Sequence, residues 1–184
     1  MWSIWGSRNS YNHGDVKYQP MRSMELVDEV IKTLEMPPPI SPSQPKESQK
    51  CSRPAVGWLK LNCDGALNIT ESLAGVGVVV RDEMGVFVAA ECRKYDHVVD
   101  PGTVELLACR DAMLLARSKG WTHIELETDC QAVVTAWKSE KAQKSACHQI
   151  IIKEMKATVS KFQGFSFAFV RRDANKAAHS CALV

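Results

Sequence analysis

The strongest constraint on the fold is the alternation in residues 59–64, LKLNCD, where apolar and polar side chains follow one another in turn. A period of two predicts a β-strand, here one that ends at Gly65. Two more strands are predicted over 74–81 and 86–92, and the turn between them, residues 82–85, is short enough for a hairpin. The folded part of the chain is therefore expected to begin as an antiparallel meander.

Helices and strands alternate in the remainder of the chain. A helix is predicted over 103–118, because Pro101 stands near its start and Gly120 just past its end. The later expected elements are a strand over 124–128 that enters a helix at Asp129, a helix over 145–162, a strand over 165–170 and a closing helix over 175–183. A meander followed by such units predicts an α/β domain.

Prolines mark a boundary upstream of this domain. Six of the eight prolines lie between Pro37 and Pro54, among serines and glutamines. Such a segment has few apolar groups to bury, so we predict a linker over 36–55. Residues 1–35 offer one short amphipathic helix, which is too little for an independent core. The chain is thus divided into an N-terminal appendage, the linker and a folded domain over 56–184.

The composition of the 184 residues, 45% hydrophobic and 24% charged, is that of a globular protein. Collagen, coiled coil and wholesale disorder are excluded. The net charge of +2 neither indicates nor excludes binding to nucleic acid. Seven cysteines, none in a C-x-x-C spacing, favour free thiols over disulfides or a zinc site.

The same features lead to an expectation about the protein's location. Free thiols indicate a reducing compartment. Residues 1–11 hold too few apolar side chains for a signal peptide, and no apolar run approaches the roughly 20 residues of a membrane helix. We therefore expect a soluble intracellular protein, cytoplasmic or nuclear, that is not secreted and does not bind a membrane.

Three acidic residues stand at the ends of predicted elements: Asp64, Glu105 and Asp129. Each has an ordinary structural interpretation, namely a turn for Asp64, a favourable helix dipole for Glu105 and a helix N-cap, at Asp129 or Thr128, for the third. If the strands that precede Asp64 and Asp129 are neighbours, the three carboxylates instead meet at one rim of the sheet.

Carboxylates in such a cluster repel one another unless divalent cations neutralise them, and their hard oxygen atoms suit Mg²⁺ or Mn²⁺. Two ions about 4 Å apart can activate a water molecule and stabilise the leaving oxygen of a phosphodiester. The pattern therefore indicates a metal-dependent hydrolase of nucleic acid as one interpretation of these acids.

Five motifs between Gly57 and the C-terminus resemble the type 1 ribonuclease H family, in its plant reverse-transcriptase-related kind. The resemblance implies a ribonuclease H-like fold, in which a five-stranded mixed sheet of order 3-2-1-4-5 is flanked by helices. Upstream, WSIWGSRN at 2–9 is similar to the segment between the two enzyme parts of non-LTR retroelement polyproteins, so the chain looks like a fragment or derivative of one. The matching motifs are LNCDGA (61–66), AGVGVVVRDEMG (74–85), VELLA (104–108), ELETDCQAVV (125–134) and RRDANKAAH (171–179).

The site residues implied by this resemblance include the three acids. Asp64, Glu105 and Asp129 match the first three of the family's four metal-binding acids, which hold two Mg²⁺ or Mn²⁺ ions. Gln131 matches a residue that contacts the hybrid substrate in its minor groove. The resemblance therefore implies that Asp64, Glu105 and Asp129 are catalytic as well as metal-binding.

The fourth position departs from the family. The fourth acid should follow Asn175 by four residues, and His179 stands there. A neutral imidazole can ligate a metal, but it brings no negative charge and favours softer ions than Mg²⁺.

Three functional hypotheses stay open at this point. The first is a metal-dependent endonuclease that hydrolyses the RNA strand of RNA–DNA hybrids, with activity weakened by His179. The alternative is a catalytically silent nucleic-acid-binding domain, and the third is an interaction domain whose acids serve only as caps. The partner is an RNA–DNA hybrid in the first case and a hybrid or double-stranded RNA in the second, and we expect the protein to be a monomer.

Overall fold

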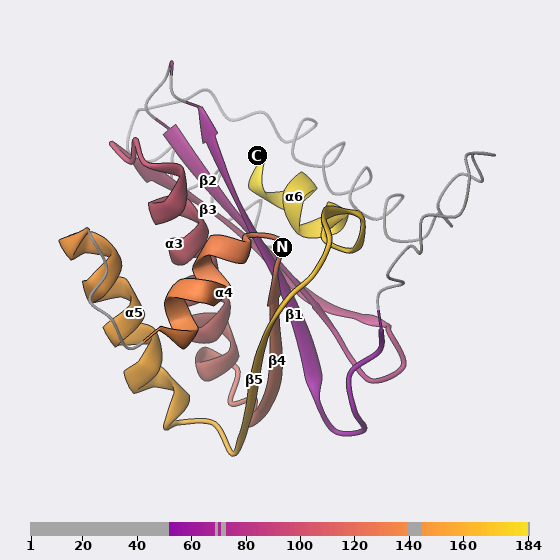
Figure 1. The fold of residues 1–184 in the computed structure, drawn as a ribbon. Coiled ribbons are helices and arrows are strands. Elements are labelled where there is room, and N and C mark those ends of the chain that lie inside the picture. The colour runs from indigo at the N-terminus through magenta and orange to yellow at the C-terminus, as the bar shows by residue number, and fades with distance from the viewer. Residues whose placement is uncertain (1–51, 69, 71–72, 140–144, 184) are drawn as a thin grey trace, which may run out of the picture. The chain divides into compact units, whose positions relative to one another are not determined.

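The computed structural model describes residues 52–68, 70, 73–139 and 145–183 (Figure 1). The predicted appendage over 1–35 and the linker as far as residue 51 lie outside the described residues. The described part thus comprises the expected folded domain, apart from residues 69, 71–72, 140–144 and 184, and the four residues before it.

A five-stranded mixed sheet forms the centre of the described domain (Figure 1). Its strands are β1 Leu59–Asn68, β2 Leu73–Arg81, β3 Phe87–Asp96, β4 His123–Thr128 and β5 Gly164–Phe169. β1 pairs antiparallel with β2, as does β2 with β3, whereas the pairs β1–β4 and β4–β5 are parallel. The strand order β3-β2-β1-β4-β5 confirms the predicted order 3-2-1-4-5.

The helices lie on both faces of this sheet. Their bounds are α3 Pro101–Ser118, α4 Gln131–Lys138, α5 Ala146–Val159 and α6 Lys176–Ala182, with the 3-10 turn η1 Arg172–Ala174 before α6. On β1, Cys63 contacts Cys109 of α3, while its neighbour Asp64 contacts His179 of α6. Because successive side chains of a strand point to opposite faces, α3 and α6 cover opposite faces. α4 and α5 lie on the side of α3 (Figure 1).

The hydrophobic core lies between α3 and the sheet. The face of α3 that meets the strands carries small side chains, which are fully buried and let the helix pack closely. α5 completes the core from the far side of α3. Its main members are Leu61, Cys63, Val76, Val78, Val80, Ala108, Cys109, Ala112, Met113, Ala116, Ile124, Leu126, Ile152 and Met155.

On the other face, the backbone of α6 lies directly on β2. A Cβ atom at Gly75 would collide with the carbonyl oxygen of Ala182, and one at Gly77 would collide with that of Ala178. Glycine at these two positions therefore permits a close approach between helix and strand backbones. The contact fixes the helix that carries His179.

The first strand is longer than its sequence pattern predicts. An end at Gly65 was expected, but β1 continues to Asn68, because its antiparallel pairing with β2 persists over residues 64–68. Its parallel pairing with β4 stops at Cys63 and Thr128. On the β4 side, the edge of β1 is therefore without a strand partner from Asp64 onward.

The polar side of the alternation in β1 is also buried, although alternation alone favours an exposed polar face. Lys60 and Asn62 are each 1% exposed. The Lys60 Nζ atom lies 2.6 Å from Glu127 Oε1 and 3.3 Å from Glu125 Oε1, and Asn62 Nδ2 donates to Glu127 Oε2 at 2.9 Å. Pairing within this group compensates for the burial of its charges.

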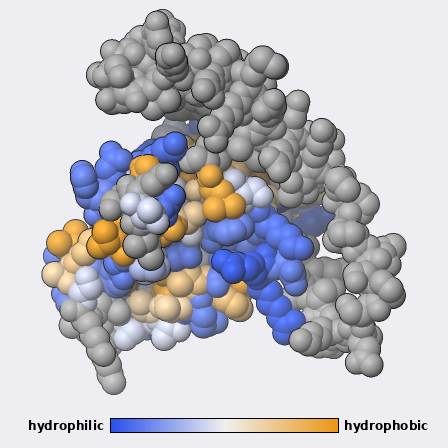
Figure 2. Space-filling model, turned by 90° about the horizontal axis from the view of Figure 1, so that it is seen from above, coloured by the Kyte–Doolittle hydropathy of each residue, from blue (hydrophilic) through white to orange (hydrophobic). Residues whose placement is uncertain are grey.

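The surface of the described part mixes polar and apolar residues, as Figure 2 shows for the face seen from above. A run of exposed apolar side chains, Met84 and residues 86–88, lies at the turn of the β2–β3 hairpin. Among the described residues, no helix has both the length and the hydropathy to cross a bilayer.

Candidate functional site

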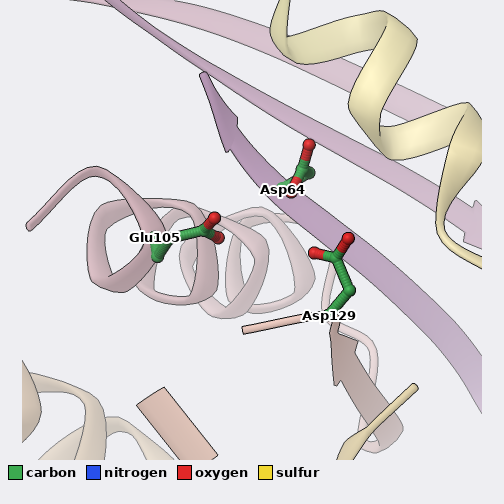
Figure 3. Close-up of side chains that lie close together, drawn as sticks. All are labelled: Asp64, Glu105 and Asp129. Carbon is green, nitrogen blue, oxygen red and sulfur yellow. The ribbon is translucent and has the colours of Figure 1, made fainter. Parts of the chain in front are cut away.

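Three carboxylates from separate elements meet beside the edge of β1. Asp64 belongs to β1, Glu105 to α3, and Asp129 follows the last residue of β4 (Figure 3). One oxygen atom from each lies within 4.8 Å of the other two. The acids predicted to converge thus lie together.

The end of β4 explains why they meet. β4 stops beside Cys63, so Asp64 and Asp129 each follow the last residue of the parallel pairing. On the α3 side, Gly65 lets the helix come close, since a Cβ atom there would lie 2.8 Å from Val104 Cγ1. This approach brings Glu105, the next residue of α3, to the same point.

The ordinary structural interpretations of the three acids are wrong. Asp64 lies within β1 and not in a turn. Glu105 is beyond the first turn of α3, which holds no acidic residue. Asp129 precedes α4, which begins at Gln131 with Cys130 as its N-cap residue.

Burial and repulsion between carboxylates disfavour the charged forms of Glu105 and Asp64 and so raise their pKa values. The pKa of Glu105 is raised to about 8, mainly by burial and also by the charges of Asp64 and Asp129, against a hydrogen bond from the Gly65 backbone. The pKa of Asp64 is raised to about 6, because burial and the charge of Asp129 together outweigh the opposing hydrogen bond with His179. Asp64 is 1% exposed, so it is not the open rim residue that the sequence pattern favoured.

A divalent cation fits this site. The Oε2 atom of Glu105 is buried and has no hydrogen-bond partner within the described part of the chain. A buried carboxylate oxygen without a donor is costly, and a cation would satisfy it. The donors are all carboxylate oxygens, which are the ligands that Mg²⁺ and Mn²⁺ prefer. Asp64, Glu105 and Asp129 would hold such an ion.

The imidazole at the fourth position contacts one of the acids. His179 Nδ1 lies 2.6 Å from Asp64 Oδ2, and the His179 side chain is 37% exposed. This contact brings α6 into the site from the face opposite α3. His179, at the position where the resemblance expects a fourth acid, thus lies beside Asp64.

Gln131 is the substrate-binding residue that the resemblance implies. It is the first residue of α4 and is exposed. Its Nε2 atom lies 3.5 Å from Thr135 Oγ1 on the next turn of the same helix. An exposed amide at the start of α4 is accessible to a ligand, and its contact with a substrate stays a prediction.

Two residues near the cluster were missed as candidates. Asn175 Nδ2 donates to Asp129 Oδ1 at 3.2 Å, and Arg172 Nε lies 3.5 Å from Asp129 Oδ2. Both residues lie within the motif RRDANKAAH, which was used only to locate the fourth ligand position. The sequence did offer a signal for Asn175. It is a polar residue four positions before His179 in this motif, and such a residue is a candidate for a contact with the site.

Solved structures of similar fold support the architecture. Ribonuclease H1 from the halophilic archaeon Halobacterium salinarum has a TM-score of 0.64 at 22% sequence identity, covering 68% of this chain and 95% of that one. The N-terminal ribonuclease H domain of a Mycobacterium tuberculosis protein has a TM-score of 0.62 at 19% identity, covering 68% and 91%. A ribonuclease H1 isolated from compost, solved in complex with an RNA/DNA hybrid, has a TM-score of 0.62 at 16% identity, covering 68% and 94%. These likenesses confirm the predicted ribonuclease H-like fold.

The sequence itself places the chain in a family. No curated protein matches it. The profile of the reverse transcriptase-like family matches residues 62–183, which include the three acids and His179. The chain therefore belongs to the reverse transcriptase-like family, and the part of it that the structure describes is a ribonuclease H-like domain.

Proposed function

We propose that this protein is a metal-dependent nuclease that hydrolyses the RNA strand of RNA–DNA hybrids with Mg²⁺ or Mn²⁺ as cofactor. The observation that carries the proposal is the convergence of Asp64, Glu105 and Asp129, whose oxygen atoms lie within 4.8 Å of one another. The fold supports it, since one structure of the same fold is in complex with an RNA/DNA hybrid.

The chain's own residues would bind and orient the reacting groups. Asp64 connects the two sides of the site, because it contacts His179 of α6 and its charge acts on Glu105 of α3. Bound divalent cations supply Lewis acidity, which lowers the pKa of an attacking water and offsets charge on the leaving oxygen. The hydrogen bond from the Gly65 backbone lowers the pKa of Glu105 and so favours its charged form, the form that would bind a cation. Gln131, exposed at the start of α4, would contact the hybrid.

A second candidate function is hybrid binding without turnover. The observation that favours it is the 2.6 Å contact between His179 Nδ1 and Asp64 Oδ2, which occupies a carboxylate oxygen of the site. With three acids and one imidazole, the site carries less negative charge to attract cations than four acids would. Phosphate and sugar contacts do not depend on that charge, so affinity for the hybrid would outlast cleavage.

The test is cleavage of a labelled RNA–DNA hybrid by the wild type, His179→Asp and Asp64→Asn. We expect slow cleavage by the wild type, faster with Mn²⁺ than with Mg²⁺, and none by Asp64→Asn. His179→Asp should raise the rate about 10²-fold, because restoring the missing charge is worth a few kcal/mol in the transition state.

The alternatives give different results in the same assay. Full activity with Mg²⁺ in the wild type, unchanged in His179→Asp, would show that the fourth position does not limit the reaction. Absence of cleavage in both proteins, with hybrid binding intact, would favour the binding domain.

A further inference from the structure

We propose that Asn175 is a positioning residue of this site, which sets the place of Asp129 relative to Asp64. The inference rests on the proposed function, because it assumes that the acids act together on a bound cation. It concerns a residue that would touch neither the substrate nor the ion.

The contacts of Asn175 are buried and specific. Its side chain is almost fully buried, and its Nδ2 atom donates to Asp129 Oδ1 at 3.2 Å and to the backbone oxygen of Cys63 at 3.0 Å. Both partners present oxygen atoms, and a backbone carbonyl only accepts. The amide nitrogen must therefore face them, which determines the orientation of the side chain.

These contacts lie at the point where the pairing between β1 and β4 ends. The parallel pairing between β1 and β4 ends at Cys63 and Thr128, directly before Asp64 and Asp129. The amide of Asn175 bridges the two strands just past this point, by binding a backbone atom on one side and the acid on the other. It therefore holds the separation between Asp64 and Asp129 where no backbone pairing between their strands does.

Asn175 also connects the site to α6. The backbone carbonyl oxygen of Asn175 accepts a hydrogen bond from the backbone N–H of His179 at 3.1 Å, in the first turn of α6. Three site residues, Asp64, Asp129 and His179, thus depend on one side chain and its backbone. A displacement of Asn175 would change their distances together.

The remaining polar atom of Asn175 argues against a role in packing alone. Its Oδ1 atom is buried and has no hydrogen-bond partner among the residues that the structure describes. An unpaired buried carbonyl is destabilising, and an apolar side chain of similar size would avoid that cost. The two hydrogen bonds of Nδ2 offset this cost, and one of them holds Asp129.

The second partner of Asp129 provides a matched control. Arg172 Nε lies 3.5 Å from Asp129 Oδ2, but the Arg172 side chain is 75% exposed, so solvent screens this pair. Removing the arginine takes a positive charge away from the acids and leaves the buried bond intact. Arg172→Ala should therefore leave the affinity for a cation unchanged or raise it.

The experiment is calorimetric titration of the metal-free full chain with Mn²⁺ alone. We expect Asn175→Ser to bind Mn²⁺ at least about 10-fold more weakly than the wild type, as is usual when a residue that orients a metal ligand is lost. Serine retains the preference of this position for a helix-start residue, but it is too short to reach Asp129. In hybrid cleavage, the same variant should lose kcat with little change in KM.

A second measurement needs no variant. In the wild type, the side-chain amide resonances of Asn175 should shift on titration with Mg²⁺, because this amide donates to Asp129, which would bind the ion. Equal Mn²⁺ affinity in Asn175→Ser and the wild type, or amide resonances that do not respond to Mg²⁺ while it binds, would overturn the inference. A wild type that binds Mn²⁺ without cleaving the hybrid would overturn the proposed function and leave the positioning role of Asn175 standing.

Discussion

Replacing Glu105 by glutamine should stabilise the metal-free protein at alkaline pH. Burial, together with the charges of Asp64 and Asp129, raises the pKa of Glu105 from 4.5 to about 8. A carboxyl group with a raised pKa in the folded state holds a proton that the unfolded chain has already released. The free energy of unfolding therefore falls as pH rises from about 4.5 to about 8, and the loss is complete above that range.

The magnitude follows from the size of this shift. One pKa unit corresponds to about 1.4 kcal/mol, so the full shift of Glu105 would cost about 5 kcal/mol. Because Glu105 is partly exposed and solvent screens its interactions, we expect about 2–3 kcal/mol. Asp64 acts in the same direction, but its pKa of about 6 confines its contribution to lower pH. A group with a pKa of about 6 still titrates up to about pH 7, so the interval from about pH 7 to 8 isolates Glu105.

The assay is urea denaturation of the wild type and Glu105→Gln in EDTA at several pH values from 5 to 8. The free energies of unfolding should be close at pH 5, and the variant should be more stable at pH 8. Adding Mg²⁺ at pH 8 should stabilise the wild type more than the variant, since only the wild type gains a third carboxylate ligand. A wild type that is the more stable protein at pH 8 in EDTA, or a difference that does not change with pH, would refute this reasoning.

Three further predictions concern metal binding, domain organisation and packing. Mg²⁺ or Mn²⁺ should raise the melting temperature of the wild type but not of Asp64→Asn, and equal shifts in both proteins by differential scanning fluorimetry would contradict the site. Limited proteolysis should cut within the predicted linker over 36–55 and leave a stable core, as judged by mass spectrometry, whereas first cleavage elsewhere would show that the N-terminal piece is integrated. Gly75→Ala should destabilise the fold by about 1–3 kcal/mol in urea, because the new methyl group collides with Ala182 of α6. Gly102→Ala, where the nearest atom to a Cβ is 3.1 Å away on the flexible ring of His148, should cost less, and equal losses would argue against the backbone contact.

The sheet could be predicted from local patterns, while the burial of its polar face could not. Alternation in residues 59–64 correctly separates the two faces of β1. It cannot show that the face with Lys60 and Asn62 is covered, since their partner Glu127 lies on another strand, and the compensating contacts are distant in sequence. Pairing of buried polar groups is a property of the assembled sheet.

The site could be predicted in its acids and less well in its geometry. Strand ends gave an approximate location for Asp64 and Asp129, because acids that follow two adjacent parallel strands lie at the same end of the sheet. The pattern placed Asp64 at a strand end, since nothing local indicates that pairing with β2 outlasts pairing with β4. The link from Asn175 to Cys63 joins residues 112 apart and has no local signature.

The glycine-mediated contact between α6 and β2 bears on how this site tolerates change. Main-chain atoms of Ala178 and Ala182 lie against β2, so the backbone of α6 holds the helix on the sheet independently of the side chain at position 179. Exchange of that side chain alters the chemistry offered to Asp64 while the scaffold beneath it keeps its place. A substitution at position 179 would therefore change the group that contacts Asp64 without requiring a change at Gly75 or Gly77 of β2.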